Sequence, residues 1–284
     1  MDSYLKFIFM FFKKKIFLTI LIIFSNVLFG QESYIVIDSL SNEPISYANI
    51  WINNKIFTNS DENGLFIIEN KNAEYNVSCL GYKKKKIDLS KKKVLLTPES
   101  INLKEIIVTN RKSNKEIKIG SNKNKDIIIA ANFDSKFAEI GKVFIPQDTT
   151  CLFLKEVKFN TFSMLKNATA KINIYSLDNN MQPYKLINYD NLICNIKKGN
   201  QKSVIKLEEY NIIVPKEGFM VSIQILLVED NKSYRQYNKN LYQYEPSLFV
   251  KKQSPDNFTY NLSEYNNWKK VPYYDLNIEI TLTN

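Results

Sequence analysis

The sequence predicts an all-β protein made of two consecutive β-sandwiches. From Tyr34 onward, apolar side chains recur mainly at every second residue, which is typical of strands. The apolar runs are short and are separated by clusters rich in Asn, Asp and Ser. These residues carry the turns, because the 284 residues include only 7 Gly and 8 Pro. A polar, charged stretch at residues 110–126 separates two β-rich halves.

Residues 1–30 have the pattern of a secretory signal peptide. A basic segment, Lys13–Lys15, precedes an apolar stretch at residues 16–24, and Gly30 offers a small residue for cleavage. An uncleaved anchor is the alternative, but the apolar stretch is shorter than the roughly 20 residues that span a bilayer. Translation from Met10 would give a more regular signal. We therefore expect an exported protein of the periplasm, outer membrane or cell surface, with membrane contact only through this segment or an anionic envelope surface.

Residues 31–109 form the first expected domain. Its seven short strands are predicted at residues 34–37, 47–52, 56–58, 65–68, 75–80, 86–89 and 94–96. The turn Asp61–Gly64 is rich in residues that tolerate a left-handed backbone, so we expect it to close a hairpin between the third and fourth strands. Seven short strands in about 75 residues predict a small antiparallel sandwich.

Four blocks of this domain stand in an order and spacing that resemble a known family. They are Pro44–Ile50 (PISYANI), Ser60–Phe66 (SDENGLF), Leu80–Lys83 (LGYK) and Leu103–Thr109 (LKEIIVT). The stretch resembles the carboxypeptidase regulatory-like domain, a transthyretin-like β-sandwich common in exported Bacteroidetes proteins, here followed by a C-terminal β-rich half. The resemblance implies a noncatalytic module that accompanies peptidases or precedes the plug of outer-membrane nutrient receptors. The family's usual opening glycine is missing, since Ser39 and Leu40 occupy that region.

Residues 127–284 form the second expected domain, after a linker at residues 110–126. Apolar and polar side chains alternate most regularly at residues 170–175, 219–228 and 276–283. Turn clusters are predicted at residues 178–180, 198–200 and 216–218. These patterns predict a second β-sandwich, jelly-roll-like in type.

The residue types missing from the chain limit its chemistry. The sequence contains no histidine, which excludes a Ser-His-Asp triad, a Cys-His dyad and a zinc site with a histidine ligand. It also lacks a Gly-x-Ser-x-Gly elbow and a glycine-rich phosphate loop. The turn Asp61–Gly64 offers too few oxygens for a calcium loop. We expect no catalytic residue, metal or cofactor, and a hydrolase using carboxylates such as Glu208 and Glu264 is the weakest alternative.

Aromatic residues are the main candidates for recognition. Residues 234–274 hold eight tyrosines and one tryptophan among many Asn. Sugar C–H faces lie against aromatic rings while amides bind hydroxyls, so this region suits a glycan. The candidate ligand-binding residues are Tyr242, Tyr244, Trp268 and Tyr273. The alternative is that these aromatic side chains pack a long loop or cover the open end of a sandwich.

Positive charge is the second candidate feature, because the formal net charge is +10. The lysine runs Lys83–Lys86 and Lys91–Lys93 either contact a polyanion such as lipopolysaccharide or form a solvated hairpin whose charges discourage edge pairing. Nucleic acid is not an expected partner, because no reading motif with interleaved aromatics is present.

Two further positions stay open. Trp51 faces either solvent or the inter-domain side. The three cysteines, Cys79, Cys151 and Cys194, cannot all pair within one chain. Cys151 and Cys194 could form one bridge, and buried free thiols are the alternative.

These expectations describe a noncatalytic exported protein of the cell envelope that acts as a scaffold or binding module. Its partner would be an envelope protein or a glycan. The alternative is a carbohydrate-binding protein that uses the aromatic region at residues 234–274.

Overall fold

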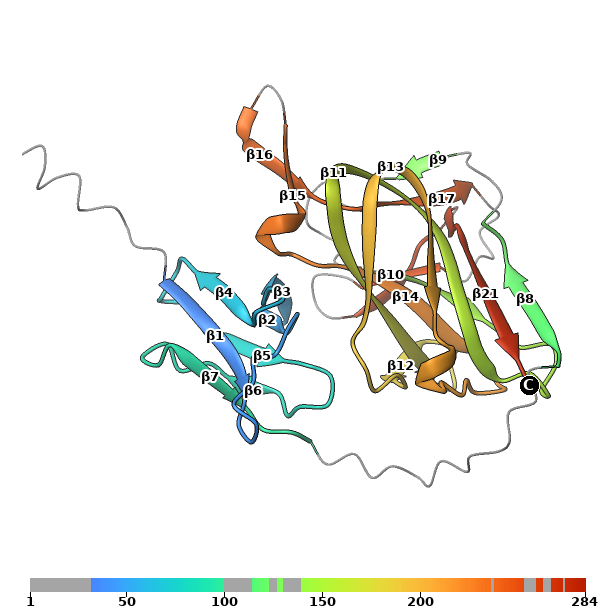
Figure 1. The fold of residues 1–284 in the computed structure, drawn as a ribbon, viewed down its shortest axis with the longest axis horizontal. Helices are drawn as coiled ribbons and strands as arrows, with labels where there is room; N and C mark the ends of the chain where they lie inside the picture. The colour runs from blue at the N-terminus through green and yellow to red at the C-terminus, as the bar shows by residue number, and fades with distance from the viewer. Residues whose placement is uncertain are drawn as a thin grey trace, which may run out of the picture.

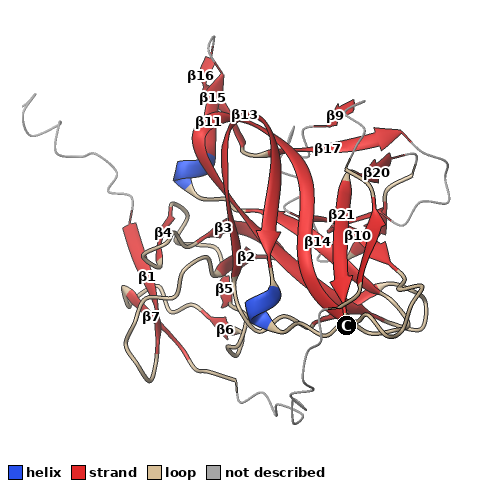
Figure 2. Ribbon diagram, turned by 45° about the vertical axis from the view of Figure 1, so that its right-hand side comes forward, coloured by secondary structure: helices blue, strands red, loops and turns tan. Residues whose placement is uncertain are grey.

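A computed structural model of the protein describes residues 32–99, 114–122, 127–129, 139–235, 238–252, 259–262, 267–272 and 274–284. This part of the chain is all-β, as the period of two predicted, and its helical segments are two single 3₁₀ turns, η1 (Glu208–Tyr210) and η2 (Glu229–Asn231) (Figure 2, blue). Within the described residues, no helix has the length and apolar character needed to cross a membrane. The predicted signal peptide lies outside the described residues.

The first unit packs a three-stranded sheet against a four-stranded sheet (Figure 1, blue to teal). Its strands are β1 (Glu32–Asp38), β2 (Asn49–Ile52), β3 (Lys55–Asn59), β4 (Leu65–Ile68), β5 (Tyr75–Ser78), β6 (Lys85–Lys86) and β7 (Lys93–Leu96). The two sheets have the strand orders β4-β1-β7 and β3-β2-β5-β6. Each of these seven strands overlaps one predicted from the sequence.

Alternate side chains of the two sheets meet in one apolar core. Val36, Ile50 and Val77 are fully buried there, and the rings of Tyr34 and Phe66 stack with centroids 5.6 Å apart. Burying a side chain the size of Ile50 contributes about 1.5–3 kcal/mol to folding. The first unit therefore has a hydrophobic core of its own.

The predicted hairpin between residues 56–58 and 65–68 is wrong. β3 pairs with β2, whereas β4 pairs with β1 in the opposite sheet, so the chain changes sheets between them. Ser60 anchors this crossing, because its buried hydroxyl donates to the Ile45 carbonyl at 3.0 Å and accepts the Ala48 N–H at 2.9 Å. Hydrophobic period alone does not say which strands pair, and here buried side-chain bonds decide it.

The turn at Asp61–Gly64 itself forms as predicted. The Asp61 carboxylate accepts the N–H groups of Asn63 and Leu65 at 2.9 and 2.8 Å. Gly64 has a φ of 76° and takes the left-handed conformation that its residue type favours. A second departure from expectation is that β1 and β7 pair in parallel, so this sandwich is not wholly antiparallel.

The second unit is a continuous twelve-stranded sheet around a separate core. Its strands are β8 (Glu116–Gly120), β9 (Ile127–Ile129), β10 (Glu139–Phe144), β11 (Phe153–Leu177), β12 (Pro183–Leu186), β13 (Leu192–Lys206), β14 (Phe219–Ile225), β17 (Ser247–Lys252), β18 (Thr259–Leu262), β19 (Trp268–Lys270), β20 (Tyr274–Leu276) and β21 (Ile278–Thr283). The main path runs β19-β18-β10-β14-β11-β17-β20, and β8, β9, β12, β13 and β21 attach beside it.

Strand β11 organises this sheet, because its 25 residues serve two layers. Its first part pairs with β21 and its last part with β14, while β13 follows it along most of its length. Leu154 and Phe159 from the first part and Ile172 from the last part enter the same buried cluster. The sheet therefore folds over onto itself around one core (Figure 1).

The turn predicted at residues 198–200 is wrong, because this segment lies inside β13. It faces a register shift in β11 between Ser163 and Asn167. Gly199 has a φ of 85° at this point. A bulge increases local twist and bends a strand pair, so the residues that look like a turn instead accommodate the bend of β11 and β13.

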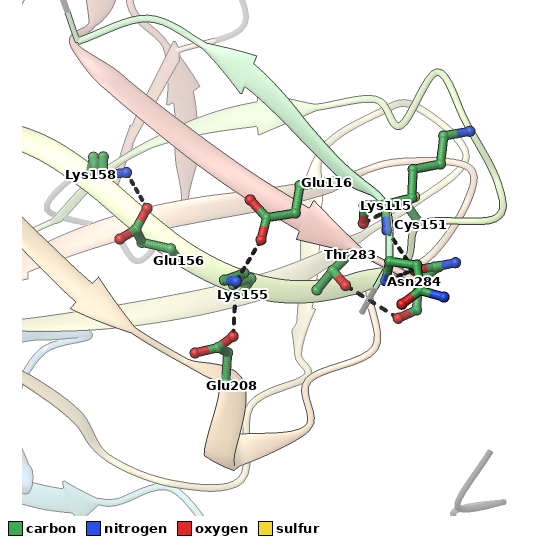
Figure 3. Close-up of polar contacts among 10 residues, drawn as sticks. Lys115, Glu116, Cys151, Lys155, Glu156, Lys158, Glu208, Thr283 and Asn284 are labelled. Atoms are coloured by element: carbon green, nitrogen blue, oxygen red, sulfur yellow. Dashed lines mark hydrogen bonds and ion pairs between the residues drawn. The ribbon is translucent and has the colours of Figure 1, made fainter. Parts of the chain in front are cut away.

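Part of the predicted linker belongs to the second unit. Residues 116–120 form β8, which runs antiparallel to β21. Lys155 on β11 lies 2.6 Å from Glu116 and 3.1 Å from Glu208, and these ion pairs tie β8 to its neighbours (Figure 3). Within residues 116–120 the charged side chains, Glu116 and Lys118, are exposed, so the polarity of this stretch fits a strand with a solvent-facing side.

Asn284 binds the two residues that precede β8. The side-chain oxygen of Asn284 accepts the N–H groups of Asn114 and Lys115 at 3.0 and 3.1 Å (Figure 3). Residues 110–113 and 123–126 of the predicted linker lie outside the described residues, so the exact domain boundary stays a prediction.

A separate two-stranded hairpin projects from the body, at the top of Figures 1 and 2. It consists of β15 (Lys232–Arg235) and β16 (Asn238–Tyr244), and it begins directly after η2. We call it the tyrosine hairpin, after Tyr234, Tyr242 and Tyr244.

The change of sheets at Asp61–Gly64 can be tested with two glycine substitutions. A Cβ on Gly64 would lie 2.7 Å from the Val36 carbonyl, whereas a Cβ on Gly81, at a φ of 80°, would meet nothing within 4 Å. We expect Gly81→Ala to lower the free energy of unfolding by about 1–2 kcal/mol, the cost of a left-handed alanine. Gly64→Ala should cost about 1–3 kcal/mol more, because a packed core must shift. Urea denaturation measures both, and equal losses would contradict the close contact.

Candidate functional site

The tyrosine hairpin brings three aromatic rings together. The rings of Tyr234 and Tyr242 meet edge to face with centroids 5.9 Å apart, and Tyr242 meets Tyr244 in the same way at 5.6 Å. Tyr234 and Tyr242 are each about half exposed, at 50% and 48%. Strand pairing explains the arrangement, because Tyr234 lies directly opposite Tyr242 in the antiparallel ladder.

Two charged groups complete this surface. Glu229 accepts hydrogen bonds from the Tyr234 hydroxyl at 2.8 Å and from Lys232 Nζ at 2.6 Å. Lys232 Nζ lies 4.7 Å from the centroid of the Tyr242 ring, a cation–π contact. Partial burial raises the pKa of Glu229, but the bonds from Lys232 and Tyr234 outweigh it and the net pKa is lowered. The carboxylate therefore stays ionised beside the exposed rings.

The third tyrosine joins the hairpin to the first unit. Tyr244 packs against a small apolar cluster of Trp51, Ile56 and Leu227. Trp51 is 8% exposed, its indole N–H donates to the Ser78 hydroxyl at 2.8 Å, and it lies at the contact between the two units. Of the two orientations left open by the sequence, the inter-domain side is therefore correct.

The remaining predicted site residues do not join the hairpin. Trp268 on β19 packs edge to face on Tyr175, with centroids 5.3 Å apart, in a separate cluster with Val143, Met220 and Tyr260. Trp268 thus has a packing role, as in the alternative in which the aromatic side chains of this region pack or cover other parts of the fold. Tyr273 lies outside the described residues. The hairpin thus keeps Tyr242 and Tyr244 of the predicted set, and it adds Tyr234.

The two units meet through buried polar groups. Leu227 follows the end of β14, and its N–H donates to the Asn59 side chain at 2.8 Å. Its carbonyl accepts the Thr58 hydroxyl at 2.7 Å and the Asn59 N–H at 3.3 Å. Gln224 donates to the side-chain oxygen of Asn49 at 2.8 Å, and Asn59 donates to the same oxygen at 2.6 Å. We call this group the interface clasp.

A buried carboxylate lies behind the clasp. Glu139 is 3% exposed and accepts hydrogen bonds from Ser222, from Asn173 at 2.9 Å and from Tyr175 at 3.1 Å. Burial raises the pKa of Glu139, and these bonds offset only part of that effect. Asn173 also donates to Gln224 at 3.3 Å, so one hydrogen-bonded chain connects Glu139 to the first unit.

The lysine runs make several contacts within the first unit. Lys86 pairs with Glu74 at 2.5 Å and Lys92 with Glu32 at 2.6 Å. Lys84 Nζ lies 5.1 Å from the centroid of the Trp51 ring. These contacts fit a solvated surface whose charges are partly paired, and they do not assemble a defined anion site.

The carboxylates considered for catalysis are engaged elsewhere or are not described. Glu208 pairs with Lys155 at 3.1 Å. Glu264 lies outside the described residues. In the part of the chain that the structure covers, no three Cys, Asp or Glu side chains gather so that they could hold a metal ion.

The cysteines of the described chain are free and buried. Cys151 and Cys194 therefore do not form the bridge that the sequence left open. Cys194 lies in the large core, and burial raises the pKa of its thiol to about 11. Such thiols are poor nucleophiles at neutral pH.

The sequence did not identify the interface clasp, although it contains a signal for it. Gln224 alternates with apolar residues on β14, which suggests a solvent-facing side, yet it is only 1% exposed. A polar side chain in a strand either faces water or bonds to a polar partner. For Gln224 only the position of the first unit shows that the second case holds.

The first unit matches a protein-family model. Residues 35–108 match the family model described as the CarboxypepD_reg-like domain. The resemblance carried by the four sequence blocks is therefore confirmed for this part of the chain. No curated protein matches the chain.

Two solved structures of Cwp84, a surface layer associated protein of Clostridium difficile, are weakly similar. The structure of its cysteine protease and lectin-like domains has 14% identity and a TM-score of 0.37, covering 51% of this chain and 32% of that one. The clostridial protease after propeptide cleavage has 15% identity and a TM-score of 0.34, covering 78% and 48%. The chain spans less than half the length of either protein, and similarity at this level supports no inference about function.

The buried position of Glu139 gives a pH-dependent prediction. The pKa of Glu139 in the folded state lies above the unfolded value of about 4.5, so the native state binds the proton more tightly. The stability that this proton contributes is present below about pH 4.5 and is lost as pH rises through the folded-state pKa. Glu139→Gln keeps an acceptor oxygen and removes the charge. We expect the variant to be more stable than the wild type at pH 8, with the difference shrinking at pH 4. Urea unfolding at both values measures this, and a pH-independent difference would contradict it.

The interface clasp gives a second prediction. If a protease site inserted after residue 109 is cut, the two fragments should stay associated during size-exclusion chromatography. Asn59→Ala should weaken the association by about 1–3 kcal/mol, because the Leu227 N–H then loses its buried partner. Asn63→Ala, in an exposed turn, is the control and should change nothing. Fragments that separate freely without any substitution would show that the clasp does not hold the units together.

Proposed function

We propose that this chain, whose residues 35–108 form a carboxypeptidase regulatory-like domain, is a noncatalytic, exported binding protein of the cell envelope. In this proposal the regulatory-like domain is an interaction module and the tyrosine hairpin carries recognition. Export is proposed from the signal-like residues 1–30, and the absence of catalysis from a sequence without histidine.

The observation that carries the proposal is that two tyrosine rings are exposed on the tyrosine hairpin, whose base packs against the rest of the protein. Tyr234 and Tyr242 each keep about half of their surface in contact with solvent. Tyrosines of this kind are enriched where proteins bind partners, because they offer a large contact area at low entropic cost and a hydroxyl for hydrogen bonding. Other exposed tyrosines, such as Tyr184 at 75%, stand outside this aromatic cluster.

A glycan is the ligand that the chemistry of this surface favours. The half-exposed pair Tyr234 and Tyr242 offers aromatic surface to the C–H side of a sugar. Glu229 supplies an ionised acceptor and Lys232 a donor next to the rings, both suited to hydroxyl groups. An envelope protein is the alternative partner for the same surface.

A glycan array with matched variants tests this function. Tyr234→Ala and Tyr242→Ala should each weaken binding by about 1–2 kcal/mol, roughly tenfold, because each removes a ring face. Tyr184→Ala removes an exposed tyrosine elsewhere, and Trp268→Ala removes a predicted site residue that lies outside the hairpin. Both should leave binding unchanged. An array without signal, or binding that survives both hairpin changes, would contradict glycan recognition at this surface.

A further inference from the structure

The tyrosine hairpin depends on two anchors at its base. The first is Leu227, whose N–H and carbonyl bond to Thr58 and Asn59 of the first unit. The second is Asn231, which is fully buried and bonds to Thr169 on β11 through both its side-chain oxygen and its amide group. η2 begins two residues after Leu227 and ends at Asn231, and the chain then enters β15 directly.

The return strand of the hairpin has its own contact with the first unit. Tyr244, the last residue of β16, packs against the apolar cluster of Trp51, Ile56 and Leu227. The Glu245 N–H donates to the Asn231 carbonyl at 2.8 Å, which closes the base of the hairpin. The side chain of Tyr244 is largely withdrawn from water, and that burial raises the pKa of its hydroxyl.

Tyr244 therefore stands between the support and the exposed rings. Its side chain packs against the apolar cluster that contains Trp51, and its ring meets the Tyr242 ring edge to face with centroids 5.6 Å apart. An isolated two-stranded hairpin is at best marginally stable in water. Among the described residues β15 and β16 pair only with each other, so the hairpin needs such side-chain support. The described contacts supply it from two directions, and one of them is the first unit.

We propose that the carboxypeptidase regulatory-like domain positions the tyrosine hairpin, with Trp51 as the principal positioning residue. Trp51 does not reach the exposed rings itself and acts through Tyr244. The inference rests on the proposed function as far as the ligand is concerned. A hairpin ordered in advance binds without paying the full entropic cost of ordering, so docking of the first unit and ligand binding are coupled.

Hydrogen exchange on the full-length protein tests the positioning without any ligand. Trp51→Ala should speed exchange of the β15 and β16 amides by at least about tenfold, because it leaves a cavity beneath Tyr244. Thr58→Val removes the hydroxyl that donates to Leu227 at 2.7 Å, with a longer contact to the Asn59 carbonyl at 3.4 Å, and should speed the same amides by roughly two- to tenfold. Phe57→Ala is the control, since Phe57 lies on the same strand but packs against Tyr75.

The amides of β1 and β5 show whether a variant still folds. If the β1 and β5 amides of Trp51→Ala also exchange faster, this variant has lost its fold, and Thr58→Val then provides the test of positioning. Unchanged exchange of the hairpin in Thr58→Val, or equal acceleration in Phe57→Ala, overturns the positioning role.

The glycan array separates this inference from the proposed function. Faster hairpin exchange with no glycan bound by the wild type supports positioning and rejects glycan recognition. If glycans bind, Trp51→Ala should weaken binding at least as much as Tyr242→Ala. Wild-type affinity in Trp51→Ala, with the hairpin exchanging faster, would overturn the coupling.

Discussion

Leu227 follows a strand that is buried on both faces, and its own N–H and carbonyl must find partners away from the sheet. Buried backbone groups without partners are costly, and here the first unit supplies the bonds through Thr58 and Asn59. The same residue contributes its side chain to the cluster that holds Trp51 and Tyr244. These hydrogen bonds of Leu227 therefore affect three features at once. They hold the two units together, set the direction of η2 and place the tyrosine hairpin.

The clasp is polar, and this favours specificity more than strength. Asn49, Asn59 and Gln224 form a short chain of bonds that ends at Glu139 behind the interface. Each bond adds little net stability, but a mispaired neighbour would leave several buried groups without partners. The interface therefore fixes one relative placement of the units. An apolar interface of the same size would tolerate sliding.

The strands of the first unit could be predicted from the sequence because each is short, alternating and bounded by turn residues. The pairing of these strands could not be predicted. The crossing at Ser60 depends on hydrogen bonds of its hydroxyl with Ile45 and Ala48, and such bonds do not show in the hydrophobic pattern of the sequence. The same limit applies to the candidate site. Aromatic content pointed to residues 234–274, and Tyr242 and Tyr244 do lie together. Trp268 is close to them in sequence but belongs to another cluster, because β17 and β18 carry the chain across the sheet in between.

The pairing of β8 with β21 bears on how the protein is made. Asn114 and Asn284 bond to each other across 170 positions of sequence, so the large sheet cannot be completed until its last strand is available. Contacts this distant slow folding, because a long loop must close before they form. The first unit needs only its own residues for its core and can fold early during synthesis. The second unit must wait with exposed strand edges, and a prefolded neighbour that binds Leu227 would give it a surface on which to assemble.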